Sequence, residues 1–276
     1  MYFNELFKAL LTLSIAFTLL LTGCVKSPLS RPLSSTPREH YIVLHSSDRQ
    51  MGTDIDHDAG NVNWAAVKST GTNWVYCKVN GGYSNADSGF VDPMFATYWP
   101  QLKKANIARG AYCFFDLNGD GETQAKKYLA LVAAAGGFNA ADLPPQLDIE
   151  WTPTPANTPF PASNTWQDEA LEWLTYVELK TGRIPIIYTG LGMAKNKFDS
   201  RFSKYPLWVA RYPTENTIKP TSNPYPKYAP KNVGPWKSWA IWQYSENGNI
   251  SGIGIGQDLD VLKGNIEDFV KKTTVE

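Results

Sequence analysis

The sequence predicts an α/β fold in which the strands close into a barrel. From Gly52 onward, short apolar runs alternate with longer amphipathic runs, which is typical of parallel strand–helix units. The apolar runs outnumber the amphipathic ones, so the last third of the barrel is expected to have lost its helices. A domain within a chain of 276 residues is long enough to bury a substantial core of this kind.

The expected elements follow one another along the chain. We expect strands at residues 52–56, 73–79, 109–115, 146–150, 184–188, 207–212, 239–244 and 257–262. We expect helices at residues 64–69, 93–105, 122–135, 166–181 and 191–198. Asn63 is a suitable N-cap for the first helix, and Gly182 is a suitable stop for the fourth.

Composition excludes some classes of function. The 26 basic and 26 acidic residues cancel, so nucleic acid is not an expected partner. With 43% hydrophobic and 19% charged residues, disorder over the whole chain is not expected. The three histidines, at positions 40, 45 and 57, are too few and too poorly spaced for a His-rich metal site. The 10 Trp, 14 Tyr and 12 Phe residues favour a large aromatic core with some stacking surfaces for sugar rings.

The N-terminus predicts export. Residues 9–21 are almost wholly apolar but too short to span a bilayer comfortably, as in a signal peptide. The following Leu-Thr-Gly-Cys resembles a bacterial lipobox, which makes Cys24 the expected lipidation site; an ordinary signal with a chance cysteine is the alternative. We therefore expect a lipoprotein signal peptide at 1–23, a lipidated Cys and flexible tether at 24–50, and a barrel domain at 51–272.

This organisation implies a location. The protein is expected to be exported and anchored to membrane by lipid, on the outer membrane or periplasmic face of a two-membrane cell and otherwise on the cell surface. Val25 rather than Asp after the lipidated Cys favours the outer membrane, by analogy with sorting rules. Cys77 and Cys113 lie in neighbouring predicted strands, where either a disulfide or two buried thiols is compatible with export.

Acidic residues end three of the predicted strands. Asp148 and Glu150 are two residues apart, so in a strand they share one face, with Leu147 on the other. Two carboxylates held together near apolar walls cannot both ionise easily, and a glycosidase needs one protonated and one charged carboxyl group. Asp54 and Asp258 lie near one end of the first and last strands, which are neighbours in a closed barrel. The four acids therefore mark a candidate catalytic site.

The motifs around these acids are specific to one family. They are GTDID (52–56), VNW (62–64), WVYCK (74–78), RGAYCF (109–114), ETQA (122–125), LDIE (147–150), PIIYT (185–189), LWVARY (207–212), WQY (242–244), GI (252–253) and DLD (258–260). In this order the sequence resembles glycoside hydrolase family 25 lysozymes, which are N-acetylmuramidases. The resemblance implies an irregular TIM-like (β/α) barrel with about five β/α units plus three further strands.

The resemblance also implies an activity and a partner. We expect cleavage of the β-1,4 bond between N-acetylmuramic acid and N-acetylglucosamine in peptidoglycan strands, without cofactor or metal. Glu150 is the expected general acid, Asp148 stabilises charge or orients the substrate's acetamido group, and Asp54 and Asp258 maintain the charge balance. The expected substrate contacts are Tyr112, Tyr188, Trp208, Tyr212, Trp242 and Lys78.

Some positions depart from the family pattern and leave alternatives open. Asn80 lies in a stretch where the family usually has Thr and Glu, Cys113 replaces a His, and Asp56 replaces a Ser. A non-catalytic glycan-binding lipoprotein is one alternative. A metal-dependent polysaccharide deacetylase using the acids around His57 is another, although that chemistry needs further His ligands. The loop starting at Asp116 resembles the first half of a calcium-binding EF-hand loop but lacks its final Glu.

Overall fold

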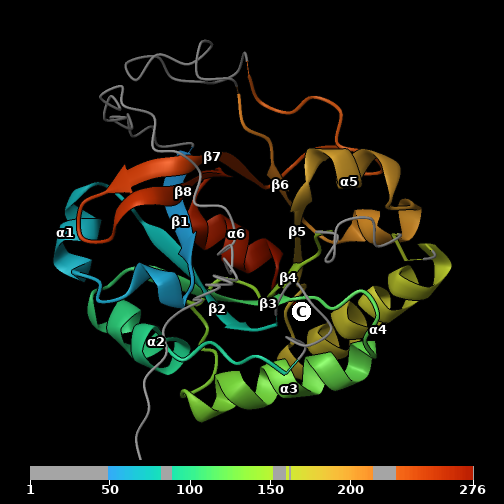
Figure 1. Cartoon of the computed structure of the whole chain (residues 1–276), viewed down its shortest axis with the longest axis horizontal. Coiled ribbons are helices and arrows are strands. Elements are labelled where there is room, and N and C mark those ends of the chain that lie inside the picture. Colours follow the sequence, from blue (N-terminus) through green and yellow to red (C-terminus); the bar gives the residue numbers. More distant parts are fainter. Residues whose placement is uncertain (1–48, 82–88, 152–159, 162, 214–227, 276) are drawn as a thin grey trace, which may run out of the picture. The chain divides into compact units, whose positions relative to one another are not determined.

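Eight strands close into a barrel in the computed structural model, which describes residues 49–81, 89–151, 160–161, 163–213 and 228–275 (Figure 1). The strands are β1 (Arg49–Ile55), β2 (Trp74–Asn80), β3 (Ala108–Phe114), β4 (Gln146–Asp148), β5 (Ile186–Gly190), β6 (Leu207–Ala210), β7 (Ile241–Ile250) and β8 (Gly254–Lys263). Neighbours from β1 to β7 are parallel, whereas β8 is antiparallel to both β7 and β1. The predicted barrel is confirmed.

Helices follow each of the first five strands. They are α1 (Trp64–Ser69), α2 (Phe95–Lys104), α3 (Gly121–Ala134), α4 (Ser163–Thr181) and α5 (Leu191–Asn196), and α6 (Ile266–Lys272) follows β8. Two short 3-10 helices lie at His57–Ala59 and Ser200–Lys204. The expected arrangement of five β/α units plus three further strands is thus confirmed. Asn63 caps α1 as predicted, by accepting the Ala66 N–H.

Several elements differ from the sequence prediction. β4 ends at Asp148 rather than at Glu150, which lies just beyond the strand. β7 and β8 are longer than expected and form a hairpin, because antiparallel pairing from Ile241 to Ile250 outweighs the polar, Gly-rich composition of this stretch. α6 was not predicted, since seven residues carry little periodic signal; Asn265 caps it by accepting the Asp268 N–H.

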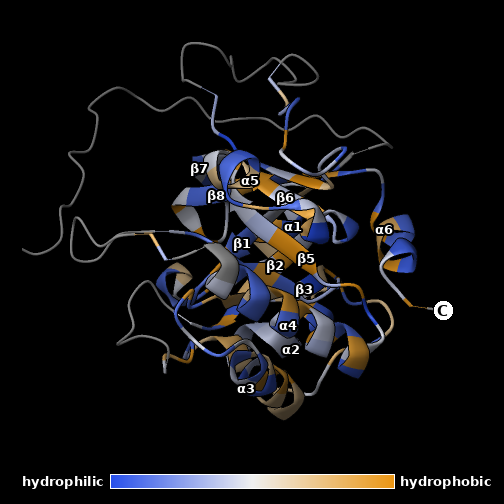
Figure 2. Ribbon diagram, turned by 90° about the vertical axis from the view of Figure 1, so that its right-hand side faces the viewer, coloured by the Kyte–Doolittle hydropathy of each residue, from blue (hydrophilic) through white to orange (hydrophobic). Residues whose placement is uncertain are grey.

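Side chains alternate between two apolar layers along each strand. On β2, Trp74 and Tyr76 point into the barrel, whereas Val75 and Cys77 join the layer between barrel and helices. Leu147 and Ile149 also lie in this outer layer, on the face opposite Asp148, as predicted. In Figure 2 strand β5, in the middle of the view, carries hydrophobic colour, while the helices around it carry both colours.

The two cysteines of the barrel are free thiols. In the pairing of β2 with β3, Cys77 of β2 lies opposite Ala111, and Cys113 of β3 lies opposite Asn80, so the two cysteines are not paired with each other. Both side chains are buried in the outer layer, at 0% and 1% exposure. The disulfide that the sequence left open is therefore not formed in this structure. Within the described residues, no helix is long and apolar enough to cross a membrane.

The predicted N-terminal segments lie outside the described residues. These are the signal peptide at 1–23, the lipidation site Cys24 and the tether up to residue 48.

Small residues on neighbouring strands make room for large aromatic rings inside the barrel. Gly52 lies opposite Trp74, and Gly110 lies opposite Tyr76. A Cβ atom added to Gly52 would lie 2.1 Å from the Trp74 ring, and one added to Gly110 would lie 2.2 Å from the Tyr76 ring. The interior is thus filled by large and small residues in alternation, and the glycines are required by close approach.

We expect Gly110→Ala to destabilise the protein by about 1–3 kcal/mol, because the new methyl group overlaps the buried Tyr76 ring. Gly192→Ala is the matched control. It lies in α5 with no atom within 4 Å of the added Cβ, so its thermal midpoint should be unchanged or higher. Thermal unfolding of both variants followed by circular dichroism tests this; equal midpoints would contradict the tight packing of β2 against β3.

Candidate active site

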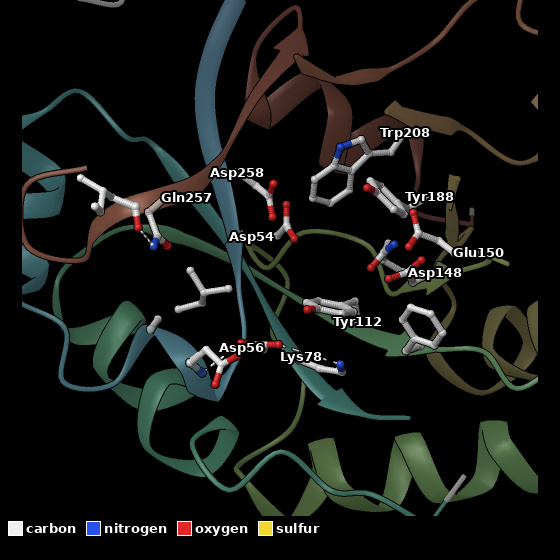
Figure 3. A pocket seen from close by; sticks show the side chains of 17 residues that line it. Asp54, Asp56, Lys78, Tyr112, Asp148, Glu150, Tyr188, Trp208, Gln257 and Asp258 are labelled. Carbon is white, nitrogen blue, oxygen red and sulfur yellow. Dashed lines mark hydrogen bonds and ion pairs between the residues drawn. The ribbon is translucent and has the colours of Figure 1, made fainter. Parts of the chain in front are cut away.

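A cavity of about 400 Å³ opens where the parallel strands of the barrel end (Figure 3). This is the end at which TIM barrels carry their active sites. The cavity is lined by Asp54, Ile55, Asp56, Asp58, Ala59, Lys78, Tyr112, Phe114, Gln146, Asp148, Glu150, Tyr188, Trp208, Ile255, Gly256, Gln257 and Asp258. The four acids that the sequence singled out are thus all brought together here.

Strand pairing places the acids in two groups. Because β8 runs antiparallel to β1 with Gly52 opposite Asp260, Asp54 and Asp258 point into the cavity side by side (Figure 3). Asp148 and Glu150 lie across the cavity from them, at the end of β4 and next to Tyr188. Glu150 stays aligned with the barrel because the Ile149 N–H donates to the Tyr188 carbonyl at 2.9 Å.

A hydrogen-bond network lies beneath Asp54. Gln243 donates from Nε2 to Asp54 Oδ1 at 2.9 Å. Its Oε1 accepts the hydroxyls of Tyr188 at 2.7 Å and Tyr212 at 2.6 Å. On the other side, Asp54 hydrogen-bonds with Asp260, whose Oδ1 accepts the Trp208 indole N–H at 3.0 Å. Polar groups on β7 and β8 therefore hold this one carboxylate, and groups on β5 and β6 support them in turn.

The bond between Asp54 and Asp260 requires a proton, since two carboxylates only accept. Asp260 is 0% exposed, and its Oδ2 has no N–H or O–H donor among the described residues. Burial, followed by repulsion from Asp54, raises the pKa of Asp260 well above its usual range. The shared proton therefore lies on Asp260, which donates to Asp54.

Burial is the largest cause of the raised pKa of Asp54, Asp148, Glu150 and Asp258. It raises the pKa of Asp54 to about 6 against the opposing hydrogen bonds of Asp260 and Gln243. Burial and the charge of Asp54 raise the pKa of Glu150 to about 7 and that of Asp258 to about 9. Burial and repulsion from Glu150 raise the pKa of Asp148 well above its usual range. Near neutral pH the cavity therefore holds protonated carboxyl groups beside an ionised Asp54.

One carboxylate oxygen in the cavity has no partner. Asp148 is 7% exposed, and its Oδ1 accepts no hydrogen bond from the described residues. An unpartnered buried acceptor is costly, and it is satisfied when a ligand supplies a donor. Asp148 therefore marks the point in the cavity where an N–H or O–H group of a ligand fits.

The predicted substrate contacts divide into three sets. Tyr112, Tyr188, Trp208 and Lys78 line the cavity. Tyr212 does not line it, but its side chain is 41% exposed while its hydroxyl reaches Gln243. The expectation for Trp242 was wrong. This side chain is 0% exposed in the outer apolar layer, where its indole N–H donates to the Arg211 carbonyl.

Sequence reasoning missed Gln243 and Asp260 as site residues. Both point into the barrel because they stand two residues from an inward neighbour, Ile241 and Asp258 respectively. The period of two along the strands was therefore a usable signal. It also places Trp242, next to Gln243, on the outward face.

The candidate metal-binding stretches hold their acids in local hydrogen bonds. Asp56 accepts the Asp58 N–H, and the ring of His57 lies 3.3 Å from Asp92 and 3.5 Å from Asp58. Asp56, His57 and Asp58 have ligand atoms within 4.8 Å of one another, without a further imidazole among the described residues. In the loop that resembles an EF-hand, Asp120 instead caps α3 by accepting the Thr123 N–H at 2.7 Å.

Comparisons with known proteins agree with this geometry. The family model described as glycosyl hydrolases family 25 matches residues 53–253. The chain is 27% identical over 230 residues to the uncharacterized protein YegX of Escherichia coli, covering 83% of this chain and 75% of YegX. It is 25% identical over 243 residues to lysozyme M1 of Streptomyces globisporus, covering 87% of this chain and 76% of that one.

A solved structure has the same fold. The bacterial lysozyme from Streptomyces coelicolor superimposes with a TM-score of 0.66 at 25% identity, covering 81% of this chain and 96% of that one.

We expect the stability gained by Asp260→Asn to depend on pH. The unfolded chain ionises Asp260 near pH 4, whereas the folded protein keeps its proton, so wild-type stability falls as pH rises above that value. Asn cannot ionise and still donates to Asp54. The difference in thermal midpoint, variant minus wild type, should therefore be larger at pH 8 than at pH 4 by about 3 °C or more.

The same substitution at the exposed Asp268 serves as the control. Its midpoint difference from wild type should be the same at the two pH values. An equally constant difference for Asp260→Asn would mean that Asp260 is ionised in the folded protein.

Proposed function

This chain belongs to family 25 of the glycosyl hydrolases and is a peptidoglycan hydrolase of the lysozyme type, and we propose that Glu150 and Asp148 carry its chemistry. The reaction is cleavage of the β-1,4 bond between N-acetylmuramic acid and N-acetylglucosamine. The observation that carries the assignment is the pair of carboxyl groups at the end of β4, which lines the cavity and whose pKa values are both raised by burial. A glycosidase needs one carboxyl group protonated.

Glu150 is the general acid in this proposal. It is only partly buried at the cavity surface, so it can give its proton to the leaving oxygen and regain it from water. Its pKa of about 7 matches that task, because a general acid is most effective when its pKa is close to the working pH.

Asp148 orients the acetamido group of the substrate. Its unpartnered Oδ1 accepts the acetamido N–H, which turns the acetamido oxygen toward the anomeric carbon. That oxygen forms a bond to the anomeric carbon while the glycosidic bond breaks and the leaving oxygen takes the proton of Glu150. Water then opens the cyclic intermediate and gives a proton back to Glu150, so the configuration is retained.

Asp54 and Asp258 hold the charge of the cavity. Asp54 has the lowest pKa of the shifted acids lining the cavity, so it carries negative charge when the others are still protonated. This charge favours the positive sugar carbon of the transition state. Asp258, with a pKa of about 9, stays neutral and offers an O–H to a sugar hydroxyl or a water. Tyr112, Tyr188, Trp208 and Lys78 supply the surrounding contacts.

We expect Glu150→Gln to lose about 10²–10⁴-fold in activity, because it keeps the shape but removes the proton. The measurement is release of reducing-end sugar from purified peptidoglycan, identified by mass spectrometry. Glu122→Gln is the control, since Glu122 pairs with Lys126 on the surface of α3 away from the cavity.

Activity of Glu150→Gln within threefold of wild type would contradict the role of Glu150. Peptidoglycan binding by the wild type without release of reducing ends would favour a glycan-binding lipoprotein instead.

We further propose that the protein is exported and attached to membrane through lipid on Cys24. The support is the order of the apolar run, small residues and Cys in residues 9–24, which lie outside the described structure. The residues between Cys24 and β1 then form the tether that lets the cavity reach peptidoglycan next to the membrane. The location is the outer membrane or periplasmic face of a two-membrane cell, and otherwise the cell surface.

We expect Cys24→Ser to remove the protein from the membrane fraction, because stable anchoring requires the acyl chains carried by that Cys. The measurement is fractionation of cells that express the full chain, with immunoblotting of each fraction. Cys77→Ser and Cys113→Ser are the controls, since these buried thiols lie within the barrel and should leave fractionation unchanged. A Cys24→Ser protein that stays in the membrane fraction would overturn the lipobox assignment.

A further inference from the structure

One amide group of β7 is hydrogen-bonded to residues on both sides of the catalytic cavity. Gln243 is 1% exposed and makes three side-chain hydrogen bonds. It hydrogen-bonds to Asp54 directly and accepts the hydroxyl of Tyr188, which lies beside Glu150 in the cavity lining. Asp54 and Tyr188, on opposite sides of the cavity, therefore belong to a single network.

The orientation of this amide is fixed by chemistry. An ionised Asp54 can only accept, so the Nε2 side of Gln243 must face it. The Oε1 side then accepts from both phenol groups, which are able to donate. The opposite orientation would place Oε1 against the carboxylate. Hydrogen bonds arranged in this one direction polarise each other toward Asp54.

We propose that Gln243 is a positioning residue. It keeps Asp54 ionised, and through its bond to Tyr188 it fixes the position of Asp54 relative to Glu150. The inference rests on the proposed function, in which Asp54 supplies the negative charge of the cavity. Gln243 does not line the cavity; it acts through Asp54 and Tyr188, which do.

The charges around Asp54 show why a donor is needed there. The charged groups that line the cavity with it or lie against it are Asp56 and Asp58 after β1, Lys78 on β2, Asp148 and Glu150 at β4, and Asp258 and Asp260 on β8. The neutral phenols near it are Tyr112, Tyr188 and Tyr212, and the charge of the exposed Glu246 on β7 acts on Glu150 and Asp258. Lys78 is the single cation in this set. Hydrogen bonds from Gln243 and Asp260 therefore carry much of the stabilisation of the Asp54 charge.

Loss of Gln243 has two opposite consequences. Without the Nε2 donor, the pKa of Asp54 rises, because a hydrogen bond to the charged form is lost. Asp54 then carries less charge, and that charge is one of the causes that raise the pKa of Glu150. The pKa of Glu150 therefore falls. The pH range of activity therefore becomes narrower, because Asp54 ionises at a higher pH and Glu150 loses its proton at a lower pH than in the wild type.

The test compares Gln243→Leu with wild type by carbon-13 NMR titration of the side-chain carboxyl groups. Asp54→Asn and Glu150→Gln assign the two signals. We expect the pKa of Asp54 to rise by about one pH unit and that of Glu150 to fall. The pH profile of reducing-end release should narrow from both sides, with kcat at least about tenfold lower at its maximum.

Gln167→Leu is the matched control. Gln167 is a buried amide that also bonds on both sides, to the Lys197 carbonyl and to Arg201, but it belongs to α4 and contacts the 3-10 helix at Ser200–Lys204. Its loss should cost comparable stability and leave both titrations and the pH profile unchanged. A purely structural role for Gln243 would make the two variants behave alike.

If Gln243→Leu does not fold, the variant Gln243→Glu tests the proposal instead. A neutral carboxyl group of the same shape donates to Asp54 and accepts from the phenols, so activity should be retained at low pH and lost as the new group ionises. The proposal would be overturned if Asp54 and Glu150 in the Gln243 variants titrate as in the wild type and the pH profile of activity is unchanged. A wild-type protein that releases no reducing ends would refute the proposed function alone, because the carboxyl titration still tests Gln243.

Discussion

The desolvation of five carboxyl groups at one end of a barrel is the constraint on which this structure depends. In Asp54, Asp148, Glu150, Asp258 and Asp260, burial is the largest cause of the raised pKa. The free-energy cost of burying these groups is reduced in two ways. Some of them keep their protons, and the one that ionises first receives hydrogen bonds from donors. The same arrangement supplies a neutral acid at neutral pH, so the destabilising burial is also the source of reactivity.

Packing below the cavity makes this burial possible. The barrel interior is filled by Trp74, Tyr76 and Trp208, whose rings meet edge to face or at an angle. These rings fit because glycines stand opposite the first two. Trp208 belongs to both parts of the molecule, since its ring lines the cavity and its indole N–H donates to Asp260. A change in the apolar interior therefore reaches the carboxyl groups of the cavity directly.

The barrel and its four acids were predictable because both follow from strand periodicity and from motifs in family order. The partners of those acids were not, since a hydrogen bond such as that between Gln243 and Asp54 joins strands far apart in the sequence. Aromatic residues were ambiguous for a related reason. Trp242 and Trp208 both lie on strands, and only the position of their inward neighbours decides which one meets the cavity. The long β7–β8 hairpin was missed because cross-strand pairing overrides its polar composition.

The protonation of the β4 pair connects substrate selection to catalysis. In the free protein, burial and repulsion favour a proton on Asp148 over one on Glu150, and Asp148 Oδ1 has no donor. In the proposed reaction, the acetamido N–H of the substrate donates to that oxygen, which stabilises ionised Asp148 and lowers its pKa. The shared proton then favours Glu150, where it is needed. A sugar without the N-acetyl group supplies neither this donor nor the attacking oxygen, so the same contact selects the substrate and prepares the acid.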